Sequence, residues 1–278
     1  MSNNFNNQAE TLELVIGAGI AKAKLPLVRL LLLGVLAGAF IAFGAAASSV
    51  ASHALGDNVG LQRFIAGVVF PVGLMLIVVV GGELFTGNCL MVEALADGKI
   101  TVLGWIRNLV PVYIGNLIGS LLIVGLVALS AQLNYSDGGL GAATIKIAAT
   151  KASLPFWTAF GSAILCNILV CGAVLGAFAA RDIVGKLLAV FFPIMAFITC
   201  GFEHCVANMY FIPAGILASA NPAYVEKAGL AADKLANLDI MGLIGNLIPV
   251  TLGNIVGGAA LGLLLYYAFR NKAASKKA

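Results

Sequence analysis

The chain has 278 residues, of which 61% are hydrophobic and only 10% are charged, and its net charge is +4. A soluble domain has charge on about a quarter of its residues, so this chain lacks the side chains to cover a soluble surface. The composition excludes a soluble globular enzyme, a disordered chain and a disulfide scaffold, and the small net charge argues against a nucleic-acid partner. It predicts an all-α protein that crosses the lipid bilayer several times.

Residues 1–26 form an N-terminal segment without the short apolar core of a signal peptide. Its stretch 10–24 has apolar residues at helical spacing, which predicts an amphipathic helix at the cytoplasmic interface; a frayed tail is the alternative. A bilayer core is crossed by about 20 apolar residues. The pore domain, 27–270, has six such segments, and a basic tail follows at 271–278. The predicted spans are 27–52, 61–96, 104–131, 155–180, 187–219 and 239–269.

The second and fifth spans are too long for one simple helix. Each contains glycines and a glutamate, so each is predicted to break midway. Of the 16 Lys and Arg residues, 11 lie on the side that holds both chain ends. Because basic residues favour the cytoplasmic side, both termini are expected to be cytoplasmic.

The chain contains an internal repeat. Residues 108–119 match 246–257 without a gap, and GGELFTGN at 81–88 aligns with GFEHCVAN at 201–208. Three spans separate the members of each pair, so the halves, about 27–131 and 155–269, must have opposite orientations. Broken helices at matching positions of an inverted repeat predict a central pathway near the bilayer midplane.

Ionisable side chains inside a span are costly to bury and mark candidate functional sites. His204 in the second break is predicted to bond and protonate a passing anion, with the Thr86 hydroxyl of the first break as its partner. A core histidine that only bonds its neighbours is the alternative. Lys151, just before the fourth span, either draws anions to the mouth or extends to the membrane interface.

Glu83 and Glu203 occupy equivalent positions of the repeat. Their symmetry indicates scaffolding, in which each carboxylate accepts hydrogen bonds from backbone N–H groups freed by a break. Asn88, Asn208 and Asn167 could serve the same purpose. No cluster of ligating side chains suggests a metal, and no cofactor is expected.

Apolar side chains next to these polar groups are candidates for constrictions of the pore. These residues are Phe70, Leu74, Leu84, Phe85, Val170 and Phe197.

The motifs together resemble the formate/nitrite transporter family. The resemblance rests on GFEHCVANMYFIPAG at 201–215, GELFTGN at 82–88 and the repeated P-V-x-x-G-N, and it runs from about residue 21 to the last span. Two positions depart from the commonest family pattern, Cys205 after the histidine and Gly87 after the loop threonine. They weaken any assignment to a subfamily.

The resemblance implies a homopentamer in the cell inner membrane, with an aquaporin-like protomer that has its own pore. Such proteins move formate, nitrite or hydrosulfide, often with a proton. By motif, His204 matches the central histidine, Lys151 the cation of the periplasmic vestibule and Asn167 the polar residue of the fourth span. Phe70 and Phe197 match the outer constriction, and Leu74, Phe85 and Val170 match the inner one, while Leu84 and Thr86 belong to the loop that breaks the second span.

Two other functional classes remain as alternatives. A water or neutral-solute pore shares the architecture, but the paired Asn-Pro-Ala signatures are missing, with one copy at 221–223. An intramembrane enzyme is disfavoured because no catalytic motif is present. Formate is the first choice of substrate, and nitrite and hydrosulfide stay open.

Overall fold

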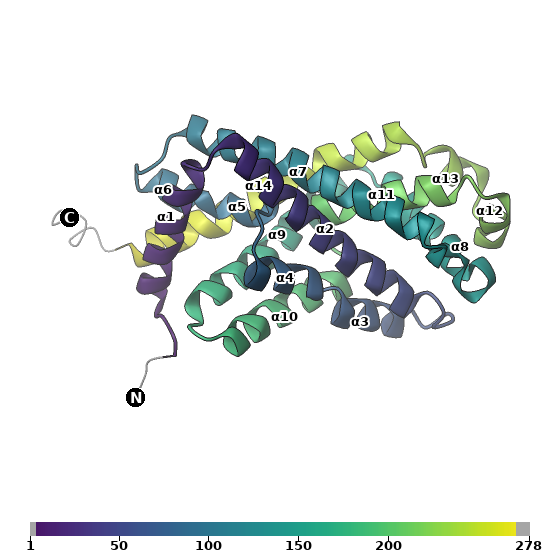
Figure 1. The fold of residues 1–278 in the computed structure, drawn as a ribbon, viewed down its shortest axis with the longest axis horizontal. Coiled ribbons are helices and arrows are strands. Elements are labelled where there is room, and N and C mark those ends of the chain that lie inside the picture. The colour runs from purple at the N-terminus through teal and green to yellow at the C-terminus, as the bar shows by residue number, and fades with distance from the viewer. Residues whose placement is uncertain (1–3, 271–278) are drawn as a thin grey trace.

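The computed structural model describes residues 4–270, and all the regular elements in that range are helices. This confirms the predicted all-α class (Figure 1). The predicted tail at 271–278 lies outside the described residues. The first half contains α1 (Gln8–Ala23), α2 (Leu27–Ser52), α3 (Val59–Val69), α4 (Val72–Val80), α5 (Phe85–Asn88), α6 (Val92–Ala96) and α7 (Val102–Leu129). The second half contains α8 (Tyr135–Ala152), α9 (Phe156–Ala179), α10 (Ile183–Cys200), α11 (Cys205–Ala218), α12 (Pro222–Ala228), α13 (Ala232–Ala236) and α14 (Ile240–Phe269).

Six helical segments are long and apolar enough to cross a bilayer, in agreement with the six predicted spans. Two shorter apolar helical segments, Phe85–Ala96 and Cys205–Ala218, complete the predicted second and fifth spans. The breaks lie at 81–84 and 201–204. Each break starts at a glycine with a positive φ, +113° at Gly81 and +72° at Gly201. Residues with a Cβ rarely adopt this backbone, so the glycines explain where the helices end.

The two halves follow the same order of elements. In each half a helix leads through a short turn into a long helix, from α1 to α2 and from α8 to α9. Figure 1 places α1 and α8 toward opposite ends of the molecule's long axis. Helix α8 lies between the predicted repeats, and sequence analysis did not assign it.

Small residues allow the long helices to pack closely in pairs. Helix α2 faces α7, where a Cβ at Gly34 would lie 2.9 Å from the Val112 carbonyl oxygen. Helix α14 faces α9, and a Cβ at Gly257 would collide with the backbone of Ile164. Without these side chains the backbones can approach each other, as is common in membrane bundles.

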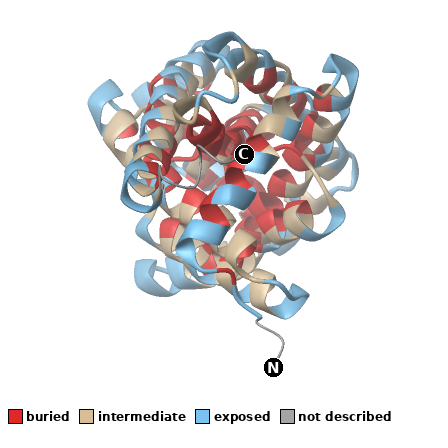
Figure 2. Cartoon of the chain, turned by 90° about the vertical axis from the view of Figure 1, so that its left-hand side faces the viewer, coloured by how far each residue is buried: buried red, intermediate tan, exposed pale blue. Residues whose placement is uncertain are grey.

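Helix α1 is docked on the helical bundle. The Asn7 side chain caps α1 by accepting a hydrogen bond from the Glu10 N–H, and the Glu10 carboxylate accepts one from the Asn7 N–H. Its apolar face, including Leu12 and Ile16, packs against Ala94 of α6 and Tyr266 of α14. Viewed from the end where α1 lies, buried residues fill the centre of the bundle and exposed residues form its rim (Figure 2).

Candidate transport site

The two breaks meet at a buried contact between Thr86 and His204. The Thr86 Oγ1 lies 2.9 Å from the His204 Nε2. Thr86 is fully buried and His204 is 2% exposed. Thr86 belongs to the first turn after one break and His204 is the last residue of the other, so the structure brings the predicted pair together.

The orientation of the His204 ring is fixed by the helix that follows it. His204 is the N-cap of α11, and its Nδ1 accepts a hydrogen bond from the Ala207 N–H at 3.0 Å. Because a ring nitrogen that accepts a hydrogen bond has no proton, the neutral imidazole has its proton on Nε2. The N–H therefore points at Thr86. The Phe197 ring stacks on the imidazole with centroids 5.8 Å apart.

Two asparagine side chains form hydrogen bonds with the backbone of the two broken loops. Asn116 of α7 accepts from the Phe85 N–H at 3.0 Å and donates to the carbonyl oxygens of Glu83 and Gly34. Asn254 of α14 accepts from the Cys205 N–H at 2.9 Å. It also donates to the carbonyl oxygens of Glu203 and Ala163. These bonds satisfy backbone groups that the breaks leave without helical partners.

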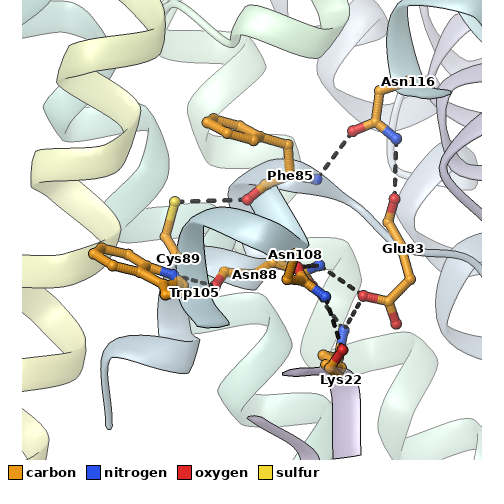
Figure 3. A network of polar contacts seen from close by, with 8 residues as sticks. All are labelled: Lys22, Glu83, Phe85, Asn88, Cys89, Trp105, Asn108 and Asn116. Carbon is orange, nitrogen blue, oxygen red and sulfur yellow. Dashed lines mark hydrogen bonds and ion pairs between the residues drawn. The ribbon is translucent and has the colours of Figure 1, made fainter. Parts of the chain in front are cut away.

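The carboxylate of Glu83 lies in a network of side chains (Figure 3). Its Oε2 accepts from the Lys22 Nζ at 3.0 Å and from the Asn88 Nδ2 at 2.6 Å. Asn88 also donates to the Asn108 Oδ1 at 2.8 Å, and Asn108 donates to the Lys22 carbonyl oxygen at 3.2 Å. The network ties the end of α1 to the first break and to α7.

Glu203 has the matching network in the second half. It accepts from the Lys151 Nζ at 2.7 Å and from the Asn208 Nδ2 at 2.6 Å. Asn208 donates to the Asn246 Oδ1 at 2.7 Å, and Asn246 donates to the Lys151 carbonyl oxygen at 2.9 Å. Lys151 also lies over the Phe211 ring, 5.4 Å from its centroid.

The expected partners of the two glutamates were wrong. Sequence analysis expected their carboxylates to accept from freed backbone N–H groups, but the carboxylates bond Lys and Asn side chains. The backbone groups instead bond Asn116 and Asn254. An amide side chain offers both a donor and an acceptor, which suits a loop that exposes both kinds of backbone group.

Sequence analysis missed Lys22 as a site residue. Lys22 belongs to the predicted N-terminal segment, but the structure gives it a glutamate and an asparagine equivalent to the partners of Lys151. Lys22 also donates to the Asn88 Oδ1 at 2.7 Å. A signal was present in the chain, because KAKLP at 22–26 matches KASLP at 151–155. Asn116 and Asn254 were noticed only as markers of the repeat.

Asn167 contacts the backbone just after the first break. Its Nδ2 donates to the backbone oxygens of Thr86, at 3.2 Å, and Asn254, at 2.6 Å. The side chain is fully buried. These bonds favour a role in positioning the loop that presents the Thr86 hydroxyl.

Two cavities are lined by sequence neighbours of Thr86 and of His204. The α1 cavity, of about 270 Å³, is lined by Lys22, Leu74, Leu84 and Gly87 among others. The α8 cavity, of about 490 Å³, is lined among others by Lys151, Gly201, Phe202 and Glu203. Residues beside Thr86 thus face one cavity, and residues beside His204 face the other. An anion between the cavities would meet hydroxyl and N–H donors.

The other predicted constriction residues lie in the core around this contact. Phe70 and Phe197 are 1% exposed and pack edge to face with ring centroids 5.5 Å apart. Val170 is equally buried. Phe85 packs against the Tyr113 ring at 4.9 Å and lines neither of the two cavities. No group of three or more metal-ligating side chains occurs within residues 4–270.

The sequence profile described as formate/nitrite transporter matches residues 9–268, nearly the whole chain. The chain belongs to the formate/nitrite transporter family. A protein of Methanothermobacter thermautotrophicus named "Probable formate transporter" is 39% identical, over 96% of this chain and 98% of that protein. A formate channel of Haemophilus influenzae is also 39% identical, over 81% of each chain.

Solved structures of the formate/nitrite transporter family support the same assignment. A pentameric formate channel with formate bound superposes with a TM-score of 0.81 at 36% identity. The match covers 87% of this chain and 96% of that one. The resemblance found in the sequence is thereby confirmed, and with it a channel fold that crosses the membrane several times.

Proposed function

We propose that this member of the formate/nitrite transporter family conducts small monovalent anions, formate first among them, with proton-linked passage at His204. The observation that carries the proposal is the buried Thr86–His204 contact, whose chain neighbours line two cavities that each have a lysine in their wall. We propose that the contact lies between these cavities on the path of the anion. Formate is preferred because the solved relative with formate bound covers most of the chain. Nitrite and hydrosulfide are the alternative substrates.

The step at His204 follows from its hydrogen bonds. The Nε2–H and the Thr86 hydroxyl both donate to the anion, which replaces their contact with each other. For His204 to transfer a proton, its Nδ1 must first take one from solvent and lose the bond from the Ala207 N–H. Transfer from Nε2 to a carboxylate then gives the neutral acid and an Nε2 without a proton. Return of the remaining proton from Nδ1 to Nε2 through solvent restores the bond from Ala207.

Neutralisation matters because the surrounding walls are apolar. A bare carboxylate in an apolar passage is far costlier than its neutral acid. We propose that Phe70 and Phe197 form the outer constriction and that Leu74, Phe85 and Val170 form the inner one, with Leu84 beside it. The burial of these side chains supports the assignment. Lys22 and Lys151 lower the cost of an anion in the cavities, each within an ion pair.

We propose a homopentamer in the cell inner membrane, by analogy with the pentameric relative. The excess of basic residues on the side of the chain ends supports cytoplasmic termini. The α1 cavity would then open to the cytoplasm and the α8 cavity to the outside. We propose transport without catalysis by the chain itself.

The proposal is tested by anion flux into proteoliposomes, with protein-free liposomes to subtract permeation of the free acids. Formate, nitrite and hydrosulfide are each measured with and without an imposed pH gradient. Formate flux that is fastest and follows the proton gradient is the expected result. Faster flux of nitrite or hydrosulfide would make that anion the preferred substrate in place of formate. Rapid water movement without anion flux would favour a neutral-solute pore.

A further inference from the structure

Arg63 of α3 lies in the wall of the α8 cavity. The described residues offer its guanidinium no hydrogen bond and no ion pair, and the side chain is exposed. The cavity wall also contains serine and threonine hydroxyls, from α2, α8 and α9. The guanidinium is therefore a free cation at the edge of a polar cavity.

The position of the guanidinium depends on the second break. A Cβ at Gly201 would collide with the Arg63 Nη1 and would lie 2.9 Å from its Cζ. The glycine that ends α10 thus leaves the space that the guanidinium occupies. Gly201 is three residues before His204, so Arg63 lies against the loop that presents the histidine.

The charges around the α8 cavity single out Arg63 further. Lys151 is paired with Glu203 at 2.7 Å, and most of this pair is buried, so the carboxylate offsets much of its charge. Arg63 and Lys146 are cations of this wall for which the described residues provide no acidic partner. Lys146 is a point charge, whereas a guanidinium is a planar fork of N–H donors.

We propose that Arg63 is a binding subsite at the mouth of the α8 cavity for planar anions with two oxygen atoms, the class to which formate and nitrite belong. Two parallel N–H groups of a guanidinium match two oxygens of one anion, and a single-atom anion such as hydrosulfide cannot accept both in that geometry. The subsite rests on the proposed function, because it supplies anions to the contact at His204. With this subsite, the protein would select between anions at the mouth of the α8 cavity as well as at the constrictions.

Three variants test the subsite in proteoliposomes. Arg63→Lys keeps the charge and removes the fork, Arg63→Gln removes both, and Lys146→Gln removes a neighbouring charge as a matched control. The anion concentration that gives half-maximal flux is measured for formate and for hydrosulfide. Arg63→Lys is expected to raise the value for formate roughly fivefold and to leave that for hydrosulfide unchanged. Lys146→Gln is expected to raise both values together, and less at high salt.

Equal changes for both anions in Arg63→Lys would overturn the subsite, because charge alone would then explain the effect. An unchanged value for formate in Arg63→Gln would overturn it as well. In both cases wild-type formate flux leaves the proposed function in place. A wild-type protein that passes neither anion would overturn both proposals.

Discussion

The imidazole of His204 is held on both nitrogens, by Ala207 on one side and Thr86 on the other. Its fixed direction is a property of the helix N-terminus, and a sequence gives no direct sign of it. The residue type was enough to select His204 as a candidate, since a histidine inside a span is rare and costly. Its tautomer needed the structure.

A single substitution tests the ion pair of the second half. Lys151→Met is expected to destabilise the protein by about 3 kcal/mol, because Glu203 would remain buried without its cation. The melting temperature of the full chain in lipid nanodiscs measures the change. The double variant Lys151→Met with Glu203→Gln should recover most of the loss. A single variant as stable as the wild type would show that the pair adds nothing to the fold.

Glu93 of α6 offers a second test at this scale. It is fully buried, and both carboxylate oxygens lack a hydrogen-bond partner in the part of the chain that the structure describes. Glu93→Met should therefore stabilise the protein by about 1–2 kcal/mol, since burying an unpaired polar group is unfavourable. Glu226→Met, at an exposed position of α12, is the control in the same melting assay. A lower melting temperature for Glu93→Met would mean that the carboxyl has a stabilising partner.

Helices α7 and α14 hold the two breaks, and they touch each other through one polar bond. The Tyr113 hydroxyl and the Thr251 Oγ1 are 2.9 Å apart, and these residues are 138 positions apart, the same separation as Asn116 and Asn254. The bond therefore joins equivalent points of the two halves. Since the Phe85 ring packs on Tyr113, the bond also supports a predicted constriction.

A double-mutant cycle measures this link. Tyr113→Phe and Thr251→Val each remove one hydroxyl with little change of shape. The double-mutant cycle of their free energies of unfolding should give an interaction energy of about 1 kcal/mol. Both variants should also let acetate pass more readily relative to formate, because Phe85 loses its fixed support. Additive losses together with unchanged anion selectivity would contradict the link.

The elements differ in how well the sequence predicted them. The breaks were predictable because glycine and glutamate interrupt apolar runs too long for one helix. The role of Lys22 was not, because its segment was interpreted by hydropathy alone and the match between 22–26 and 151–155 is short. The hydrogen bonds of Asn116 and Asn254 to the broken loops depend on contacts between helices that are distant in sequence. The periodicity of apolar residues does not encode such contacts. Helix α8 lies between the apolar spans and gave no membrane signal.

For the whole molecule, the two halves build similar sites near opposite ends of the chain's helical bundle (Figure 1). Each half has a lysine, a glutamate and two asparagines in a similar pattern of bonds, next to a cavity. The patterns differ in one bond, because Lys22 also donates to the Asn88 Oδ1 at 2.7 Å, whereas the Asn208 Oδ1 has no partner among the described residues. The centre breaks this symmetry, because His204 of one half faces Thr86 of the other. Similar sites at both ends, with a histidine between them, agree with the proposed passage of an anion with a proton.

His204→Asn tests most directly whether His204 links the proton to the anion. Asparagine keeps an N-cap acceptor for α11 and removes the titratable ring. Labelled formate and the lumen pH are recorded together in proteoliposomes across a range of external pH, with protein-free liposomes as the background. The wild type should move protons with formate, and the variant should lose most of this flux and its dependence on pH. A variant whose formate flux keeps the pH dependence and proton movement of the wild type would show that His204 does not link the proton to the anion.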